Sequence, residues 1–252
     1  MEPRRVFIIT VNRGYKMYEY NVRVGFSQTD VNHRMNLTAI IDAFQDCSCF
    51  HSEDLGVGFY YLQPKNLVWV INYWEVEFDR IPEYGEHITV GTYPYLFKSF
   101  LGHRNFYLKD EQGNMIVRAN SLWTLMDWEK MRPSRPDEKI VAAYELTEKL
   151  DMEYNPRKIA IPEDANAEKK EQVIIQASHL DSNGHVNNGQ YIKIAIAMIP
   201  QVTEYRRLRV EYRNQAHLGD VISPVVYSTE AGYVIALNDE EGNAYAVIEL
   251  RY

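Results

Sequence analysis

Two kinds of hydrophobic pattern recur along this chain and predict strands and a buried helix. Residues 66–78 and 207–213 are rich in β-branched and aromatic side chains, which is typical of β-strands. The stretch after Asn187 is apolar on nearly every side, and Lys193 is its one charged residue. We therefore expect a helix there that is buried rather than laid on the surface.

Three stretches of the first half recur in the second half in the same order. One pair shares D-x-N followed by a basic residue, the next shares Val-Glu-aromatic followed by Gly-acid, and the last shares the hairpin signal Asp-Glu-x-Gly-Asn. The pairs are 22–36 with 173–187, 74–88 with 208–222, and 107–115 with 236–244. A shared order of separate blocks indicates an internal duplication. The first copy has extra residues at 51–66.

The duplicated pattern predicts an α+β fold made of two tandem domains, each a long helix wrapped by an antiparallel β-sheet. We expect an N-terminal domain over 1–135, a linker over 136–157 and a C-terminal domain over 158–252. Prolines and alternating charges at 131–139 break both the strand and the helix periods, so the boundary is expected near them.

Composition narrows the classes of function. The chain has 252 residues and a formal net charge of −8, which argues against nucleic acid as a partner because phosphate binding needs a concentrated basic face. No apolar run has the length of a membrane span, so no membrane association is expected. Residues 1–16 are too weakly apolar for a signal peptide. We expect a cytoplasmic protein.

The cysteines suggest neither disulfides nor a metal. Cys47 and Cys49 cannot build a disulfide framework, and with His51 they do not complete four metal ligands. We expect both to be small buried hydrophobes. No Walker loop or dinucleotide-binding glycine pattern is present in the sequence, so no cofactor is expected.

The chain resembles the acyl-acyl carrier protein thioesterases of plants and bacteria. Residues 66–92 are similar to the family's tryptophan-containing strand pair, 121–127 to its next landmark, and 180–192 to its signature D-x-N-x-H-x-N-N-x-x-Y. The resemblance implies a double hotdog fold and hydrolysis of the thioester of acyl-acyl carrier protein, which releases free fatty acid. An acyl-CoA thioesterase, or a non-catalytic hotdog protein that binds acyl thioesters, is the alternative.

The signature contains the groups that thioester hydrolysis needs. A thiol leaves readily because its pKa is roughly 8.5, so the enzyme has to activate water and stabilise the carbonyl oxygen. Free N–H groups where a helix begins, near Asn187 and Asn188, can stabilise the negative charge that develops on this oxygen. His185 suits the role of base. Asn183 can donate to the carbonyl or orient water, and Asp181 can orient His185 or accept a proton itself.

The resemblance assigns catalytic roles to Asp181, Asn183 and His185. A structural role is open for Asp181, because Asp and Asn before a helix are common caps, and we interpret Asn187 and Asn188 mainly as caps. The first copy has Arg34 in place of His185, and arginine stays protonated. We therefore expect one active centre per chain, with the first copy's cavity holding the acyl chain as in the family.

One departure from the family concerns the strand that ends near residue 217. Its plant members have a Glu-Cys pair where this chain has Gln215 and Ala216. This favours direct attack by water without a covalent acyl-enzyme. Gln215 either positions that water or is an exposed strand residue. His217 is expected to be a surface residue.

The expected partner is acyl carrier protein, and a homodimer is possible. An acidic protein that meets an acidic carrier needs a local positive patch. The arginines between 206 and 213 are candidates, although a solvated strand face explains them equally well. Lys130, Arg132 and Arg135 are further candidates.

Overall fold

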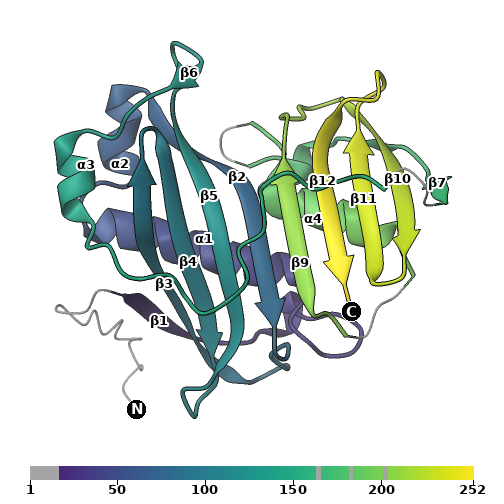
Figure 1. Cartoon of the computed structure of the whole chain (residues 1–252), viewed down its shortest axis with the longest axis horizontal. Helices are drawn as coiled ribbons and strands as arrows, with labels where there is room; N and C mark the ends of the chain where they lie inside the picture. The colour runs from purple at the N-terminus through teal and green to yellow at the C-terminus, as the bar shows by residue number, and fades with distance from the viewer. Residues whose placement is uncertain (1–16, 163–165, 182–183, 201–203) are drawn as a thin grey trace, which may run out of the picture.

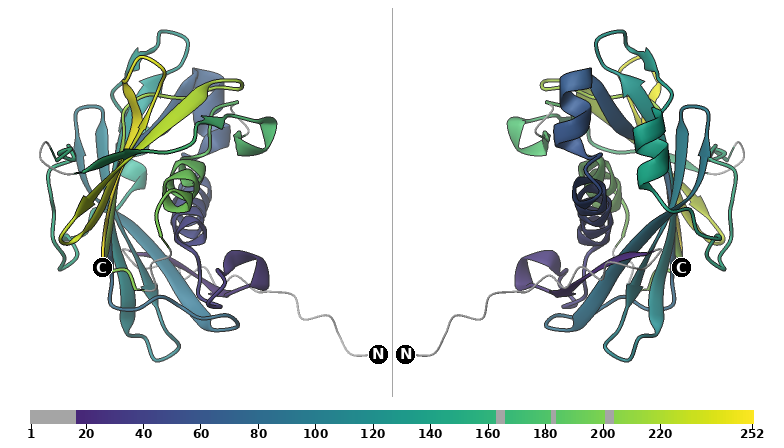
Figure 2. Two further views of the ribbon diagram at one scale, coloured as in Figure 1. Left: turned by 90° about the vertical axis from the view of Figure 1, so that its right-hand side faces the viewer. Right: turned by 90° about the vertical axis from the view of Figure 1, so that its left-hand side faces the viewer.

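The computed structural model of the chain describes residues 17–162, 166–181, 184–200 and 204–252. A single twisted antiparallel sheet extends through both halves of the molecule, and the two longer helices lie on one face of it (Figure 1, Figure 2). These helices are α1 (Leu37–Asp54) and α4 (Asn188–Ala197); the shorter ones are α2 (Phe59–Leu62) and α3 (Glu138–Ala143).

The strands follow the predicted repeat. Those of the first half are β1 (Tyr18–Arg23), β2 (Leu67–Phe78), β3 (His87–Lys98), β4 (Leu101–Lys109), β5 (Met115–Asp127) and β6 (Arg132–Pro133). Those of the second half are β7 (Ala167–Lys169), β8 (Val173–Ile174), β9 (Arg207–Tyr212), β10 (Val221–Thr229), β11 (Gly232–Asn238) and β12 (Ala244–Arg251). The expected α+β fold is confirmed.

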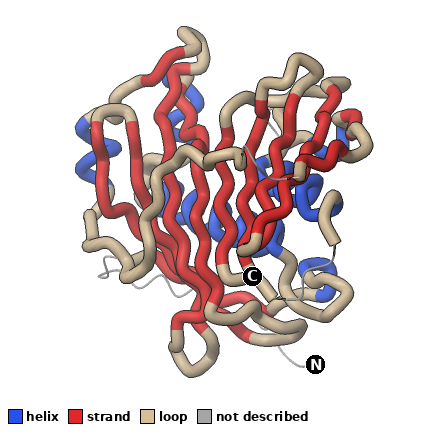
Figure 3. The backbone as a smooth tube through the Cα atoms, turned by 45° about the vertical axis from the view of Figure 1, so that its right-hand side comes forward, coloured by secondary structure: helices blue, strands red, loops and turns tan. Residues whose placement is uncertain are grey.

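The two halves share one sheet because β2 pairs with β9. The strand order is β1-β3-β4-β5-β2-β9-β12-β11-β10-β7, and Trp74 of β2 lies opposite Val210 of β9. Figure 3 shows the strands of both halves side by side without a break. The duplicated units are therefore joined edge to edge, which removes an exposed edge from each.

The central helices bury their apolar faces against this sheet. Phe44 of α1 packs against Trp74 and Phe106, with ring centroids 6.1 and 5.3 Å away. Helix α4 buries Tyr191, Ile192, Ile194 and Ala195, as its apolar pattern predicts, but leaves Lys193 exposed.

The helices meet at the first turn of α4. A Cβ atom on Gly189 would lie 2.7 Å from Cγ2 of Thr38 and 3.0 Å from Oδ1 of Asp42, so a larger residue there would push α1 and α4 apart. Next to it, Nδ2 of Asn188 donates to Oε1 of Gln45 on α1 at 3.1 Å. Glycine thus allows the start of α4 to lie directly on α1.

The duplication is visible in the loops as repeated hydrogen bonds. Asp30 Oδ1 accepts from the backbone N–H of Arg34, and Asp181 Oδ1 accepts from that of His185. In the hairpins, Asp110 and Asp239 each accept from the backbone N–H groups two and four residues later. The same sequence pattern produces the same turn in both halves.

The chain between the halves crosses the outer face of the sheet, on the side away from α1 and α4 (Figure 1). Buried Glu75 of β2 accepts from the backbone N–H of Asn155 at 2.9 Å and from its side chain at 2.6 Å. Arg209 of β9 donates to Tyr73, to Glu249 and to the carbonyl of Pro156. A polar network on the sheet therefore fastens the crossing segment.

Part of the expected linker packs against the first half. Ile140 of α3 and Tyr144 are buried in a cluster with Val57, Leu62 and Leu125. The boundaries proposed from the sequence for the two domains remain a prediction. Among the described residues, no helix combines the length and the apolar character needed to cross a membrane.

Replacing Glu75 with alanine should strongly destabilise the protein. The change leaves Arg209 with one carboxylate partner fewer and leaves the donors of Asn155 without their acceptor. Breaking a buried charged network costs on the order of 3 kcal/mol. We expect a loss of this size in the free energy of unfolding, measured by urea denaturation.

Glu168→Ala is the matched control. Glu168 pairs with Lys170 at the surface, where such pairs contribute roughly 1 kcal/mol or less. Equal losses for the two variants would show that the network does not fasten the crossing segment.

Candidate active site

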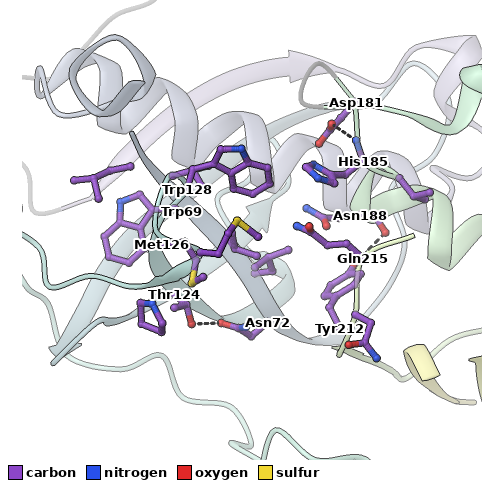
Figure 4. Close-up of a pocket in the computed structure, with 18 of the residues that line it drawn as sticks. Trp69, Asn72, Thr124, Met126, Trp128, Asp181, His185, Asn188, Tyr212 and Gln215 are labelled. Atoms are coloured by element: carbon purple, nitrogen blue, oxygen red, sulfur yellow. Dashed lines mark hydrogen bonds between the residues drawn. The ribbon is translucent and has the colours of Figure 1, made fainter. Parts of the chain in front are cut away.

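A cavity of about 630 Å³ lies where the two halves meet. The first half contributes Trp69, Asn72, Thr124, Met126 and Trp128 to its wall, and the second contributes Asp181, His185, Asn188, Tyr212 and Gln215 (Figure 4). Three of the four residues predicted for catalysis, Asp181, His185 and Gln215, therefore face one space. Asn183 lies outside the described residues.

His185 sits in a tight loop that Asp181 shapes. The backbone N–H of Asp181 donates to the carbonyl of His185 at 2.8 Å, and Asp181 Oδ1 accepts from the N–H of His185 at 3.2 Å. Gly184 takes a left-handed conformation, with φ of 79°, which glycine adopts without steric cost. Asp181 thus orients His185 through its backbone.

The His185 ring packs between two aromatic side chains that the sequence pattern did not identify as neighbours. It lies edge to face with Trp128 at 5.0 Å and with His217 at 5.4 Å between ring centroids. Burial lowers the pKa of His185 below its ordinary value, His217 lowers it further, and Asp181 opposes both. The imidazole is therefore neutral near pH 7 and able to accept a proton.

His217 is exposed, as expected of a surface residue, but it also contacts the site. Its backbone N–H donates to Asp220 Oδ2 at 2.8 Å, and its Nδ1 lies 3.6 Å from the same oxygen. Trp128 comes from the first half, just after β5. Contacts such as these between separate segments leave no signal in the spacing of residues.

Among the described residues, one backbone N–H group at the start of α4 has no acceptor. The N–H of Asn187 donates to the carbonyl of His179, that of Gly189 to Oδ1 of Asn187, and that of Gln190 to the carbonyl of Asn187. Within the described part of the chain, the N–H of Asn188 has no acceptor. It lies at the positive end of the helix dipole, and Asn188 is one of the residues that line the cavity.

The two asparagines have different roles. Asn187 caps α4, as predicted. The interpretation of Asn188 as a cap was wrong, because its side chain donates to Gln45 of α1 instead. A cap was the common expectation for an asparagine at this position, and the neighbouring helix could not be known from the sequence.

Gln215 lines the cavity and lies beside Asn188 in Figure 4. The chain around it is fixed to the His185 loop, since the Ala216 carbonyl accepts from the N–H of Val186 at 3.2 Å and the Ala216 N–H donates to the hydroxyl of Tyr191 at 2.9 Å. Gln215 is exposed. It can contact a water molecule at the cavity mouth.

A second cavity of about 520 Å³ continues from the first into the N-terminal half. The two share Phe59, Val68, Trp69 and Asn188 in their walls. Farther in, Leu62, Phe97 and Trp123 line the second one. A long, largely apolar molecule can therefore extend from His185 into the first half.

The corresponding loop of the first copy lacks this environment. Asp30 accepts from the backbone of its loop as Asp181 does, yet Arg34 lines neither cavity. Both loops thus share the hydrogen bond from the backbone N–H to the aspartate, and the cavity reaches only the copy with a histidine at the position of His185.

The cysteines differ from expectation in one respect. Cys47 is buried in the core, but Cys49 is exposed and lines the second cavity, so the prediction that both are buried was wrong for Cys49. Both are free thiols. Among the described residues, no group of three or more His, Cys, Asp or Glu side chains is arranged to hold a metal ion.

Comparison with known proteins gives consistent matches over both halves. Residues 15–144 match the model of the acyl-ACP thioesterase N-terminal domain, and residues 162–251 match that of the C-terminal domain. A palmitoyl-acyl carrier protein thioesterase of Gossypium hirsutum is 25% identical over 195 residues, which are 74% of this chain and 47% of the relative. An oleoyl-acyl carrier protein thioesterase of Arabidopsis thaliana is 23% identical over 83% of this chain and 62% of the relative. The chain thus spans about half the length of the curated relatives it matches.

Solved structures show the same fold. An acyl-ACP thioesterase from Bacteroides thetaiotaomicron superimposes with a TM-score of 0.84 at 23% identity, covering 94% of this chain and 97% of that one. The 12:0-ACP thioesterase from Umbellularia californica superimposes with a TM-score of 0.81 at 17% identity over the same shares. With family models matched across both halves, the chain belongs to the acyl-ACP thioesterase family.

Proposed function

We propose that this protein hydrolyses the thioester of acyl-acyl carrier protein and releases a free fatty acid. The observation that supports this most directly is the meeting of a neutral imidazole, His185, and an available helix N–H, that of Asn188, on one cavity wall. Membership of the family supports the same substrate class.

The proposed reaction needs no covalent intermediate on the protein. His185 accepts a proton from water as the water oxygen bonds to the thioester carbon. The carbonyl oxygen becomes negative and accepts from the N–H of Asn188. The C–S bond then breaks, and the thiolate leaves and takes up the proton. Gln215 orients the water, and Asn183 is proposed as a further donor to it or to the carbonyl.

The second cavity is proposed to hold the acyl chain, and the hairpin β5–β6 to meet the carrier. Met131 and Pro133 of this hairpin line the first cavity, which supports Arg132 and the nearby Arg135 as the residues that meet the carrier. Lys130 is less suited, because it already pairs with Asp127. The arginines of β9 are less suited to an acidic partner, because Arg207 and Arg209 already form ion pairs with glutamates. The free thiols of Cys47 and Cys49 support a reducing, cytoplasmic setting.

His185→Ala should lower kcat for acyl-acyl carrier protein by roughly a hundredfold or more, as expected for loss of a general base. The measurement is steady-state hydrolysis with acyl-carrier-protein and acyl-CoA thioesters of the same chains. Lys193→Ala, on the exposed side of α4, is the control for changes in this half of the molecule. A His185→Ala enzyme that retains full activity would exclude the proposed base, and faster turnover of the CoA esters would exclude the proposed carrier.

The pH dependence should reflect the lowered pKa of His185. A base with a lowered pKa stays unprotonated to lower pH. On the acid side, kcat/KM should therefore fall only below about pH 6.5, which is the ordinary pKa of histidine. His217→Gln removes a neighbour that disfavours the imidazolium. This variant should therefore shift the acid limb to higher pH while kcat at alkaline pH is retained. An unchanged limb would show that His217 does not act on His185.

Direct attack by water predicts that no acylated protein accumulates. Intact-mass measurement during turnover should show the unmodified chain, because Ala216 provides no thiol and buried Cys47 has a raised pKa. The variant Cys49→Ser tests the remaining thiol and should retain full turnover. A trapped acyl adduct on any residue would refute the mechanism.

A further inference from the structure

The inner end of the second cavity contains a buried cation. Arg104 of β4 is 7% exposed and lines this cavity. Its Nη1 donates to Nδ1 of His51 at 3.0 Å and to Oγ1 of Thr92 at 3.2 Å. A guanidinium stays protonated in proteins, so Arg104 brings a buried positive charge to a wall that Glu53 also lines.

The side chains shown in contact with Arg104 are uncharged. Burial, and then the charge of Arg104, lower the pKa of His51 to about 3, so its imidazole is neutral. Burial raises the pKa of Cys47 and Cys49, so both remain thiols. No carboxylate in the described residues forms an ion pair with Arg104. Buried charges are normally paired, and the described part of the chain provides no ion-pair partner for this one.

Part of the guanidinium is still available to a ligand. The Tyr144 side chain lies beside the guanidinium, with its ring centroid 5.3 Å from Cζ, and it favours the charged form of Arg104. In the described part of the chain, no carboxylate or carbonyl oxygen accepts from Nε or Nη2 of Arg104. The one fully enclosed side-chain donor there without a partner is Nε1 of Trp74, so the remaining donors of Arg104 are not sealed inside the protein. They border the cavity that Arg104 lines.

The position of Arg104 corresponds to the inner part of a bound chain. Gln45 contacts Asn188 at the start of α4, whereas His51 and Ser52, next to Arg104 and Tyr144, lie about two turns farther along α1. Two helical turns span roughly 10 Å. A chain whose carbonyl lies at Asn188 therefore reaches Arg104 with its methylene carbons or with its end.

We propose that Arg104 forms a subsite for a carboxylate at the distal end of the acyl chain, so that the preferred substrates are thioesters of dicarboxylic acids. This rests on the proposed function of the same cavity. A methyl end would leave the guanidinium buried without a counter-charge, whereas a carboxylate supplies both that charge and two acceptor oxygens. Charge-assisted hydrogen bonds of this kind are the strong ones in proteins.

The test compares pairs of acyl-carrier-protein thioesters of equal chain length, one ending in a methyl group and one in a carboxylate, over a series of lengths. At the lengths that reach Arg104, kcat/KM should favour the carboxylate end by roughly tenfold to a hundredfold. Arg104→Met, of similar volume, should remove or reverse this preference. Arg118→Met is the matched control, because Arg118 pairs with Asp79 and lines neither cavity.

A substrate whose distal carboxylate is a methyl ester repeats the test in the unaltered protein, and so does not depend on how the Arg104 variant folds. It should lose the advantage of the free carboxylate. Equal kcat/KM for methyl-ended and carboxylate-ended chains at every length, or a preference that survives in Arg104→Met, would overturn the proposal.

Binding separates this proposal from that of hydrolysis. In His185→Ala, quenching of tryptophan fluorescence by each thioester reports binding without turnover, since Trp69 and Trp123 line the cavity. Tighter binding of the carboxylate-ended chain would support the subsite even if no thioester were hydrolysed. Rapid hydrolysis of methyl-ended chains without any carboxylate preference would refute the subsite and leave the hydrolase intact.

Discussion

The antiparallel pairing of β2 with β9 determines where chemistry is possible in this molecule. It joins two copies of one unit edge to edge, and Trp74 of β2 then lies opposite Val210 of β9. Because the sheet is continuous, α1 and α4 lie on the same face and meet where Gly189 allows close approach. The start of α4 is thereby placed beside a wall formed by the other half. Without that pairing, the donors of α4 and the apolar cavity of the first half would not share one space.

Duplication separated two tasks that a single unit would have to combine. In both copies an aspartate accepts from the backbone N–H four residues later, and this bond forms whether that residue is an arginine or a histidine. At the position that corresponds to His185 the first copy has Arg34, which cannot accept a proton. Free of the reacting groups, the first half contains a longer helix and the added α2, which cover the second cavity. A lengthened central helix and an unreactive loop are consistent with a half specialised for holding a chain.

Local features were predictable from the sequence, whereas contacts between segments were not. Some features depend only on neighbours within a few residues, so the local sequence predicts them. They are the D-x-N loop, the cap at Asn187 and the Asp-Glu-x-Gly-Asn hairpins. Trp128 and His217 reach His185 from separate segments, and no periodicity specifies which strand lies beside which loop. For the same reason Asn188 was assigned as a cap, although its partner, Gln45, lies on another helix.

The electrostatics of the two cavity ends follow from how each charge is solvated. His185 is partly buried beside another histidine, and both effects lower its pKa, so the imidazole is neutral and ready to accept a proton. Arg104 cannot lose its charge, so its burial favours a cavity occupant that provides a negative charge. A side chain that destabilises the empty fold can persist where its partner arrives with the substrate, because binding then provides the missing interaction. A buried charge without an ion-pair partner therefore indicates most about the ligand where it borders a cavity, as Arg104 does.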